Sequence, residues 1–562
     1  MARSEKRKNK TFLKIIIVLV FLVTVIFTLT IAKNYLRDDI TDKTNLIINN
    51  SNVTTSLKKE ILQEGDMVYI SKQDIENFFD PYIYYDEKYD KIITGSSTKL
   101  AAIPMQGNFI EVNSASQKVK GVAIKKEDTY YIPFSELEDV FQVKVTHIKE
   151  KNTVVIDSLD KSYSVATASK NISVKYKPNF FSRTVEKIKV GETLVIANRQ
   201  DYPVPDGWTR VRTSNGTLGY VKTNNMGEIN QLRQEIKEEK KIEGTISLVW
   251  DYYSEYVYAP NRAGTMIKGV NVVSPSFFAL EKLGKGNVKT NIGDQGKAYI
   301  KWAHEQGYQV WPMISNESMI QTTSEIMNDY QLREKLINQI VNYIVEYNLD
   351  GINIDFENMY EADKKLFSRF LIELEPRLNE IGAVLSVDVT APDGSDTWSM
   401  CYDRYTIGKV ADYIIFMAYD QYGATAPKEG TTAGCNWVEA NITKFLGQEG
   451  VAPEKLVLGV PFYTRLWKEQ NGKITSDTVD LKDVDKVIPS GVTKKWDENL
   501  KQNYVEYAQN GATYKMWIED AKSIEAKLDL VQKYNLAGAA YWEKDRENSS
   551  IWNLVASKLK IE

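Results

Sequence analysis

The sequence predicts an α/β protein whose largest part is a (β/α)8 barrel, preceded by a small α+β domain, a small β-barrel and an N-terminal transmembrane helix. Three observations predict this class. Strand-like and helix-like segments alternate over residues 246–562, two β-rich regions of different pattern come before them, and an uncharged apolar run lies near the N-terminus. The 562 residues leave room for several domains, since one domain usually has about 100 to 200 residues.

The apolar run, residues 15–32, carries no charge and directly follows a basic cluster. Its 18 residues approach the roughly 20 that span a bilayer, and the basic end of such a helix stays in the cytoplasm. We therefore expect residues 12–32 to be an uncleaved anchor, with residues 1–11 cytoplasmic and the rest of the chain on the cell-wall side of the cell membrane. A cleaved signal peptide is the alternative, but its apolar core is usually shorter, about 7 to 15 residues.

Composition excludes several classes of function. A net charge of -4 gives no reason to expect nucleic acid as a partner, and only two histidines leave little scope for a metal cluster or a Ser-His-Asp triad. We expect no metal and no cofactor. Two cysteines, Cys401 and Cys435, cannot form a disulfide framework, and the sequence leaves open whether they pair. Any catalysis is expected to depend on carboxylates.

Residues 33–56 are polar and predict a linker. In the next region, 57–165, residues 67–79 ("MVYISKQDIENFF") and 129–141 ("TYYIPFSELEDVF") resemble each other at an offset of 62. Each copy pairs a β-type stretch with a short amphipathic segment, which predicts a pseudo-symmetric α+β domain. It resembles the N-terminal domain of copper amine oxidases, but no metal-ligand cluster accompanies it, so we expect a structural or wall-contacting spacer.

Residues 168–226 contain short β-rich runs separated by turn signals. The last run, "GWTRVRTSNGTLGYV", resembles the end of a bacterial Src-homology-3-like barrel, with Trp208 and Tyr220 as its aromatic residues. Both could equally be ordinary core residues. The charge-dense residues 227–245 predict a solvated helical connector.

From residue 246 onward the chain reads as eight strand and helix units, which fits a barrel of this kind. The expected strands are "ISLVWDYY", "GVNVVSP", "YQVWPMIS", "GINIDFE", "VLSVDVTAP", "DYIIFMAYD", "LVLGVPFY" and "LAGAAYWE".

The fourth of these strands has polar side chains at alternate positions. Because successive side chains point to opposite faces, Asn353, Asp355 and Glu357 share one face and apolar residues occupy the other. Unpaired buried carboxylates cost several kcal/mol, so stability does not explain them. Active sites of barrels lie at the C-terminal ends of the strands. The sequence therefore predicts an active site there, and a polar network without chemistry is the alternative.

The segment "DGINIDFE" resembles the DxxDxDxE signature of family 18 glycoside hydrolases, the chitinase-like enzymes. "MAYD" at residues 417–420 and Trp542 in "AAYWE" support the resemblance, and "WIED" at 517–520 points to the spore-germination and cortex-lytic branch. This family uses the 2-acetamido group of the substrate as nucleophile. Asn353 departs from the commonest pattern, an aspartate, which lowers the cost of ionising Asp355 and alters the pH tuning.

The resemblance implies a role for each matched residue. Glu357 would be the general acid and then the base, and Asp355 would orient the acetamido nitrogen and stabilise the developing positive charge. Tyr419 would hydrogen-bond the acetamido carbonyl and Trp542 would lie under the reacting sugar. The expected catalytic residues are Glu357, Asp355, Asn353 and Tyr419, and the expected substrate-binding residues are Asp350, Met417, Asp420, Trp542, Tyr463 and Arg465.

The resemblance, combined with the expected membrane anchor, implies an extracellular hydrolase that cleaves N-acetylglucosamine linkages of peptidoglycan by substrate-assisted retaining hydrolysis. Its partners would be that glycan and, through the N-terminal helix, the membrane. Two alternatives stay open: a chitinase, and a glycan-binding scaffold that has lost catalysis. Loss of the acid would mark the scaffold, and Glu357 is present.

Overall fold

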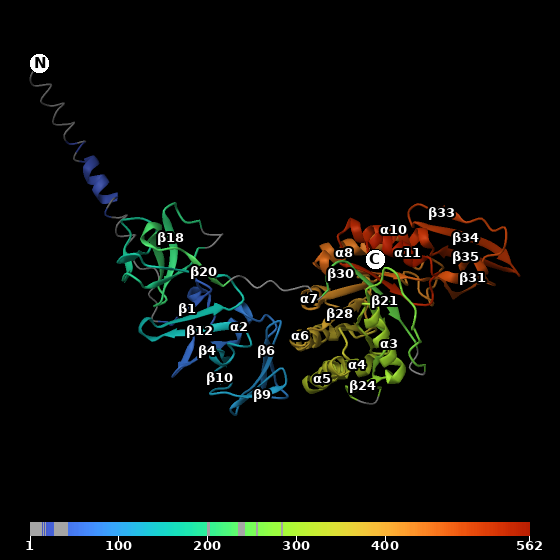
Figure 1. Ribbon diagram of the computed structural model, residues 1–562, viewed down its shortest axis with the longest axis horizontal. Coiled ribbons are helices and arrows are strands. Elements are labelled where there is room, and N and C mark those ends of the chain that lie inside the picture. The colour runs from blue at the N-terminus through green and yellow to red at the C-terminus, as the bar shows by residue number, and fades with distance from the viewer. Residues whose placement is uncertain are drawn as a thin grey trace, which may run out of the picture. The chain divides into compact units, whose positions relative to one another are not determined.

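The computed structural model describes residues 14, 16, 18–26, 28, 43–198, 203–233, 242–253, 257–282 and 285–561 (Figure 1). The chain divides into two compact units, one of residues 1–96 and 101–239 and one of residues 97–100 and 240–562. Each unit has its own hydrophobic core. The units are described separately below.

The predicted transmembrane helix, residues 12–32, lies partly outside the described residues, as do residues 33–42 of the predicted linker and residues 234–241 of the predicted connector. Those residues of 12–32 that are described are helical. Among the residues that the structure describes, no helix is both long and apolar enough to cross a membrane. The transmembrane helix is therefore not confirmed.

The first module of the N-terminal unit consists of three small sheets. Its first strand, β1 (Asn45–Ile48), pairs in parallel with the last, β13 (Thr153–Ser158), and its Leu46 and Ile47 are buried. The module thus begins inside the predicted linker. The remaining strands are β2 (Ser51–Asn52), β3 (Leu62–Glu64), β4 (Met67–Ser71), β5 (Tyr84–Asp86), β6 (Lys91–Gly95), β7 (Leu100–Pro104), β8 (Phe109–Val112), β9 (Ala115–Lys118), β10 (Ile124–Lys126), β11 (Thr129–Pro133) and β12 (Val143–Ile148).

The two similar segments of this module pair with each other. Strands β4 and β11 are antiparallel, and Ile70 lies opposite Ile132, its equivalent at an offset of 62. Helix α2 (Lys72–Phe78) follows β4 and is capped by Ser71, whose hydroxyl accepts a hydrogen bond from the Asp74 amide. The equivalent cap position after β11 is Pro133, which has no hydroxyl, and only a short 3-10 turn follows. The module is therefore mostly β, which corrects the predicted α+β class.

The second module is a seven-stranded antiparallel sheet in the order β16-β15-β19-β18-β17-β14-β20. Its core consists mainly of aliphatic residues, with the methionine Met226. Whether it belongs to the Src-homology-3-like class stays a prediction. The strands are β14 (Tyr163–Thr167), β15 (Ile172–Lys175), β16 (Thr184–Ile188), β17 (Thr193–Ile196), β18 (Trp208–Thr213), β19 (Leu218–Lys222) and β20 (Asn230–Arg233).

The C-terminal unit contains the predicted barrel, closed where β36 pairs with β21. All eight expected strands are present, although the second and third are each interrupted and form two shorter strands. The barrel strands are β21 (Ile246–Asp251), β22 (Val272–Pro275) with β23 (Phe278–Leu280), β25 (Gln309–Val310) with β26 (Met313–Ser315), β27 (Gly351–Asp355), β28 (Val384–Val389), β29 (Tyr413–Met417), β30 (Leu456–Pro461) and β36 (Gly538–Trp542). Strand β24 (Val288–Thr290) pairs with β23.

Helices surround the barrel, and their apolar faces pack on the outward side chains of the strands (Figure 1). They are α3 (Gly293–Glu305), α4 (Ile320–Met327), α5 (Tyr330–Tyr347), α6 (Lys364–Glu380), α7 (Arg404–Val410), α8 (Cys435–Gly447), α10 (Ala521–Lys533) and α11 (Ile551–Leu559). The largest core cluster of the chain lies between these helices and the strands. Both cysteines are buried there and unpaired.

A five-stranded antiparallel sheet between β30 and β36 was not anticipated from the sequence. Its strands are β31 (Tyr463–Gln470), β32 (Lys473–Asp480), β33 (Lys495–Asp497), β34 (Gln502–Gln509) and β35 (Ala512–Ile518), with the short helix α9 (Val484–Val487) after β32. Since β31 follows β30 directly, this sheet begins at the C-terminal edge of the barrel, where active sites of this fold lie.

Candidate active site

Strand β27 carries the three predicted polar residues to the C-terminal edge of the barrel. Helix α5 ends at Asn348, which adopts the left-handed conformation (φ 53°) and lets the chain turn directly into the strand. Ile352 and Ile354 are completely buried against the surrounding helices. Asn353 therefore points into the barrel, and Asp355 is the last residue of the strand.

Asn353 is the centre of a buried hydrogen-bond network. Its Oδ1 accepts from Trp250 Nε1 at 2.8 Å, and its Nδ2 donates to Asp388 Oδ1 at 2.8 Å and to Ser386 Oγ at 3.1 Å. The indole can only donate, so the amide orientation is fixed and Nδ2 must face the carboxylate. The barrel thus has an acidic group beside Asn353, supplied by the neighbouring strand β28.

Asp388 was missed in the sequence. A signal was present, because in "VLSVDV" the polar Ser386 and Asp388 alternate with apolar residues as they do in β27. Asp388 is 1% exposed and Ser386 is completely buried. The same alternation that predicted Asp355 could have found Asp388.

Three carboxyl groups at this end of the barrel, those of Asp355, Glu357 and Asp388, are shifted toward their protonated forms. Burial, followed by the charges of Glu357 and Asp388, raises the pKa of Asp355 well above its ordinary value. Burial also raises the pKa of Asp388. Burial and the charge of Asp420 raise the pKa of Glu357 to about 7, although hydrogen bonding with Asp355 opposes the shift. Within the described residues, Asp355 Oδ1 is buried without a hydrogen-bond partner.

The backbone that presents Glu357 is held from both sides. Asn316 accepts from the Glu357 amide at 3.0 Å and donates to the Glu357 carbonyl at 2.8 Å. The Tyr402 hydroxyl donates to the Phe356 carbonyl at 2.8 Å. The Glu357 carboxyl is therefore placed by rigid neighbours, as a proton donor must be.

Tyr419 and Asp420 follow strand β29 at the same edge. Burial, with the Asp388 carboxylate nearby, raises the pKa of Tyr419, which keeps its hydroxyl available as a donor. Asp420 Oδ1 accepts from the Tyr463 hydroxyl at 2.7 Å and from Arg465 Nη2 at 3.2 Å. Tyr463 and Arg465 begin the inserted sheet at β31, so the sheet contributes to the site.

Aromatic side chains form one side of the site. Trp542, the last residue of β36, lies 5.8 Å from Trp250 and 5.7 Å from Tyr252 between ring centroids. Met417 is the last residue of β29. The structure thus brings together nine of the ten predicted site residues at the C-terminal edge of the barrel.

Asp350 is the exception. It precedes β27 at the opposite, N-terminal edge, where its Oδ2 contacts His304 Nε2 at 2.9 Å and accepts from the Val310 amide at 2.8 Å. Asp350 lies five residues before Asp355, which along a strand corresponds to about 16 Å. The structure therefore places Asp350 at the start of the strand, away from the other predicted site residues.

The acidic residues of "WIED" also lie outside the site. Glu519 is completely buried and pairs with Lys527 Nζ at 2.9 Å. Asp520 caps helix α10 by accepting from the Ser523 amide. Both residues anchor this helix after strand β35.

A buried acid, a second carboxyl two residues before it and an aromatic wall at the C-terminal edge of a barrel are typical of hydrolases that use carboxyl groups for proton transfer. The profile of glycosyl hydrolases family 18 matches residues 249–547, more than half of the chain. The chain belongs to this family and is a chitinase-like glycosidase.

Curated relatives agree with this assignment. The uncharacterized glycosylase YvbX of Bacillus subtilis is 25% identical over 304 residues, covering 52% of this chain and 85% of the relative. The cortical fragment-lytic enzyme of Bacillus anthracis is 22% identical over 249 residues, covering 42% of this chain and 56% of the relative. The chain thus has spore cortex-lytic enzymes among its relatives. Its match with the Bacillus anthracis enzyme covers only about half of that enzyme's length.

Solved structures share the fold. A chitinase from Chromobacterium violaceum aligns with a TM-score of 0.50 at 23% identity, over 57% of this chain and 100% of that one. The spore cortex-lytic enzyme SleL of Bacillus cereus aligns with a TM-score of 0.50 at 18% identity, over 67% of this chain and 90% of that one. At these identities the likeness supports the barrel fold alone.

Proposed function

We propose that this protein cleaves N-acetylglucosamine linkages of peptidoglycan by substrate-assisted hydrolysis with retention of configuration. The observation that carries the proposal is the pair formed by Asp355 and Glu357, two residues apart at the barrel edge, with the pKa of Glu357 raised to about 7. At neutral pH a large fraction of Glu357 is protonated, as a general acid requires.

In the first step, Glu357 donates its proton to the glycosidic oxygen and the bond to the anomeric carbon breaks. The acetamido carbonyl oxygen of the same sugar attacks that carbon and forms a cyclic oxazolinium ion. Asp355 orients the acetamido nitrogen and stabilises the positive charge, and its unpartnered Oδ1 is suited to accept from that N–H. Tyr419 donates to the acetamido oxygen, and Trp542 packs against the sugar ring.

In the second step, ionised Glu357 accepts a proton from water while the water oxygen attacks the anomeric carbon. The oxazolinium ring opens and the acetamido group is restored. Two displacements at one carbon restore the original configuration. Asn353 and Asp388 act through Asp355, and Tyr463 and Arg465 act through Asp420, so these residues hold the site in position.

Peptidoglycan is proposed as the substrate because of the relatives named cortical fragment-lytic enzymes and the two additional modules before the barrel.

The membrane anchor at residues 12–32, and an active site on the cell-wall side, are proposed from the apolar run and its basic flank in the sequence. Fractionation of cells, with protease treatment of intact protoplasts, tests the anchor: the barrel should be membrane-bound and accessible from outside.

The activity is tested by incubating the protein with purified peptidoglycan and, separately, with chitin oligosaccharides, and measuring new reducing ends. We expect the wild type to release them from peptidoglycan, with N-acetylglucosamine at the new end, and Glu357→Gln to be at least about 100-fold slower. Cleavage of chitin alone would identify a chitinase. Binding without cleavage of either would identify a scaffold.

A further inference from the structure

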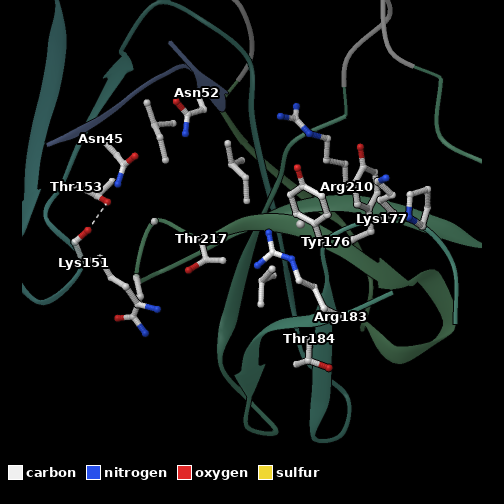
Figure 2. A pocket seen from close by; sticks show the side chains of 18 of the residues that line it. Asn45, Asn52, Lys151, Thr153, Tyr176, Lys177, Arg183, Thr184, Arg210 and Thr217 are labelled. Carbon is white, nitrogen blue, oxygen red and sulfur yellow. Dashed lines mark hydrogen bonds between the residues drawn. The ribbon is translucent and has the colours of Figure 1, made fainter. Parts of the chain in front are cut away.

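A cleft of about 1010 Å³ lies within the N-terminal unit, between its two modules (Figure 2). One wall comes from β1, β2 and β13 of the first module, and the other from β16, β19 and the loop after β15 of the second. Ligand sites commonly have volumes of about 300 to 1,000 Å³, so the cleft can hold a substantial ligand. None of the functions above uses it.

The charge of the cleft is one-sided. Its lining includes four cationic side chains and, among the described residues, no carboxylate: Lys151, Lys177, Arg183 and Arg210. They come from both walls, since Lys151 belongs to the first module and the others to the second. The rest of the lining is rich in asparagine and threonine side chains, which donate and accept hydrogen bonds as sugar hydroxyls do. Such a lining favours an anion that also carries hydroxyl groups.

Arg183 is the most informative of the four. Its guanidinium carbon lies 4.2 Å from the centre of the Tyr176 ring, and its Nε is buried without a hydrogen-bond partner among the described residues. Figure 2 shows the guanidinium pointing toward the middle of the cleft, between Thr217 and Tyr176. The aromatic ring orients the guanidinium plane, and the terminal N–H groups of Arg183 can donate to a ligand such as a carboxylate or phosphate.

The walls of the cleft are fixed relative to each other. Arg212 of β18 pairs with Asp157 of β13 at 2.7 Å, and the Arg212 side chain is 5% exposed. Gly216, with φ +74°, lies so close to the first module that a side chain there would meet Ile148 at 2.9 Å. The cleft is therefore preformed, which reduces the entropy cost of binding.

We propose that this cleft binds an anionic, hydroxyl-rich polymer, a chain of sugars or polyols that carries carboxylate or phosphate groups. Arg183 and Lys177 on one wall and Lys151 on the other contact the anionic groups, and the amide and hydroxyl side chains contact the sugar. Cell envelopes offer two sources of this chemistry: glycan strands with peptide carboxylates, and polymers of glycerol phosphate. The cleft would hold the chain on the wall independently of the barrel.

The test measures binding by calorimetry with the full-length protein carrying Glu357→Gln, so that no glycan is cut. The probes are soluble peptidoglycan strands that bear peptides, poly(glycerol phosphate), and neutral chitotetraose. Arg183→Gln and Lys151→Gln, one from each wall, are compared with Lys187→Gln, which removes the same charge from an exposed position of β16 outside the cleft. Thermal melting confirms that each variant is folded.

We expect each cleft variant to weaken binding of at least one anionic probe about tenfold, while Lys187→Gln and the binding of chitotetraose stay unchanged. The probe that responds identifies the source, and a response of both identifies the shared anion chemistry. No binding of either anionic probe, or equal losses for Lys187→Gln and the cleft variants, would overturn the proposal. None of these results depends on whether the barrel hydrolyses glycans.

Discussion

Asn353 determines how charge is distributed inside the barrel. The family signature usually has a carboxylate at this position, whereas here an amide hydrogen-bonds Asp388 on the next strand. Two carboxylates within hydrogen-bond distance cannot both ionise, so an amide at one position and a carboxylate at the other is a consistent pair. In this chain the acidic group next to position 353 is therefore supplied by Asp388 of β28.

This arrangement predicts the behaviour of Asn353→Asp. The new carboxyl would face Asp388 across the present 2.8 Å contact, so one of the two would stay protonated in the folded state, with a pKa above the unfolded value of about 3.9. A group with a raised folded-state pKa loses stabilisation as pH rises. We expect the free energy of unfolding, measured in urea, to fall below that of the wild type by about 3 kcal/mol at pH 8 and by less at pH 5.

The reciprocal change provides the control. Asn353→Asp combined with Asp388→Asn again has one carboxylate and one amide, and should recover most of the lost stability at pH 8. A double variant no more stable than Asn353→Asp would show that the two side chains do not act as a pair.

Asp420 predicts a shift in the pH dependence of catalysis. Its charge contributes to the raised pKa of Glu357, so Asp420→Asn should lower that pKa below about 7. The acid is then lost at lower pH, and the alkaline limb of kcat/KM should move down by about 0.5 to 1 pH unit. Asn tolerates the left-handed backbone at this position (φ 54°), so the loop is retained.

Tyr463→Phe is the matched control for this shift. It removes the 2.7 Å hydrogen bond to Asp420 and leaves the charge in place. Its kcat/KM should fall while the alkaline limb stays where it is in the wild type. An unshifted limb in Asp420→Asn would mean that burial alone sets the pKa of Glu357.

At the scale of elements, the junction between β35 and α10 depends on one buried ion pair. Glu519 and Lys527 are both completely buried, and Glu519 also accepts from Gln502 and Ser523. Glu519→Gln would leave the lysine charge without compensation, and we expect the free energy of unfolding to fall by about 3 to 5 kcal/mol.

Adding Lys527→Met removes the second charge and should restore most of the loss caused by Glu519→Gln. Asp485→Asn, which breaks the exposed ion pair with Lys494 in the same inserted region, should change stability little. If Glu519→Gln and Asp485→Asn lowered the urea midpoint equally, burial of the ion pair would not determine how much its loss destabilises the protein.

The elements differ in how far the sequence predicts them. The eight barrel strands were found because they are apolar or alternate with period two and are separated by helices. The inserted sheet was missed because strands such as β32 are largely exposed, with little apolar periodicity. Asp350 was predicted to bind substrate because it belongs to the same sequence motif as Glu357. The five-residue strand β27 lies between these two residues, so they are at opposite edges of the barrel. Asp388 was missed because it lies on a different strand from the motif.

At the scale of the whole molecule, the sequence predicted a multidomain chain with the barrel at the C-terminal end. The helical content of the first module was overestimated, since an amphipathic segment with proline at the cap position forms only a turn. The cleft in the N-terminal unit was not predicted. Its lining comes from segments between residues 45 and 220 that meet only after folding.

The chain combines a catalytic barrel with a separate cleft for an anionic glycan. We therefore expect the cleft to affect the rate of hydrolysis of large, insoluble substrates and not that of small ones. Binding through the cleft would raise the effective concentration of the barrel at insoluble peptidoglycan. The double variant Arg183→Gln, Lys151→Gln should release reducing ends from insoluble peptidoglycan about tenfold more slowly than the wild type at low salt, because it has lost charged contacts with the wall. At high salt the difference should be smaller, because screening weakens the same contacts in the wild type. The rate on soluble oligosaccharides should be unchanged. Equal losses on both substrates would mean that the substitutions disturb the barrel, and no loss on either would mean that the cleft does not contribute to capture of the wall.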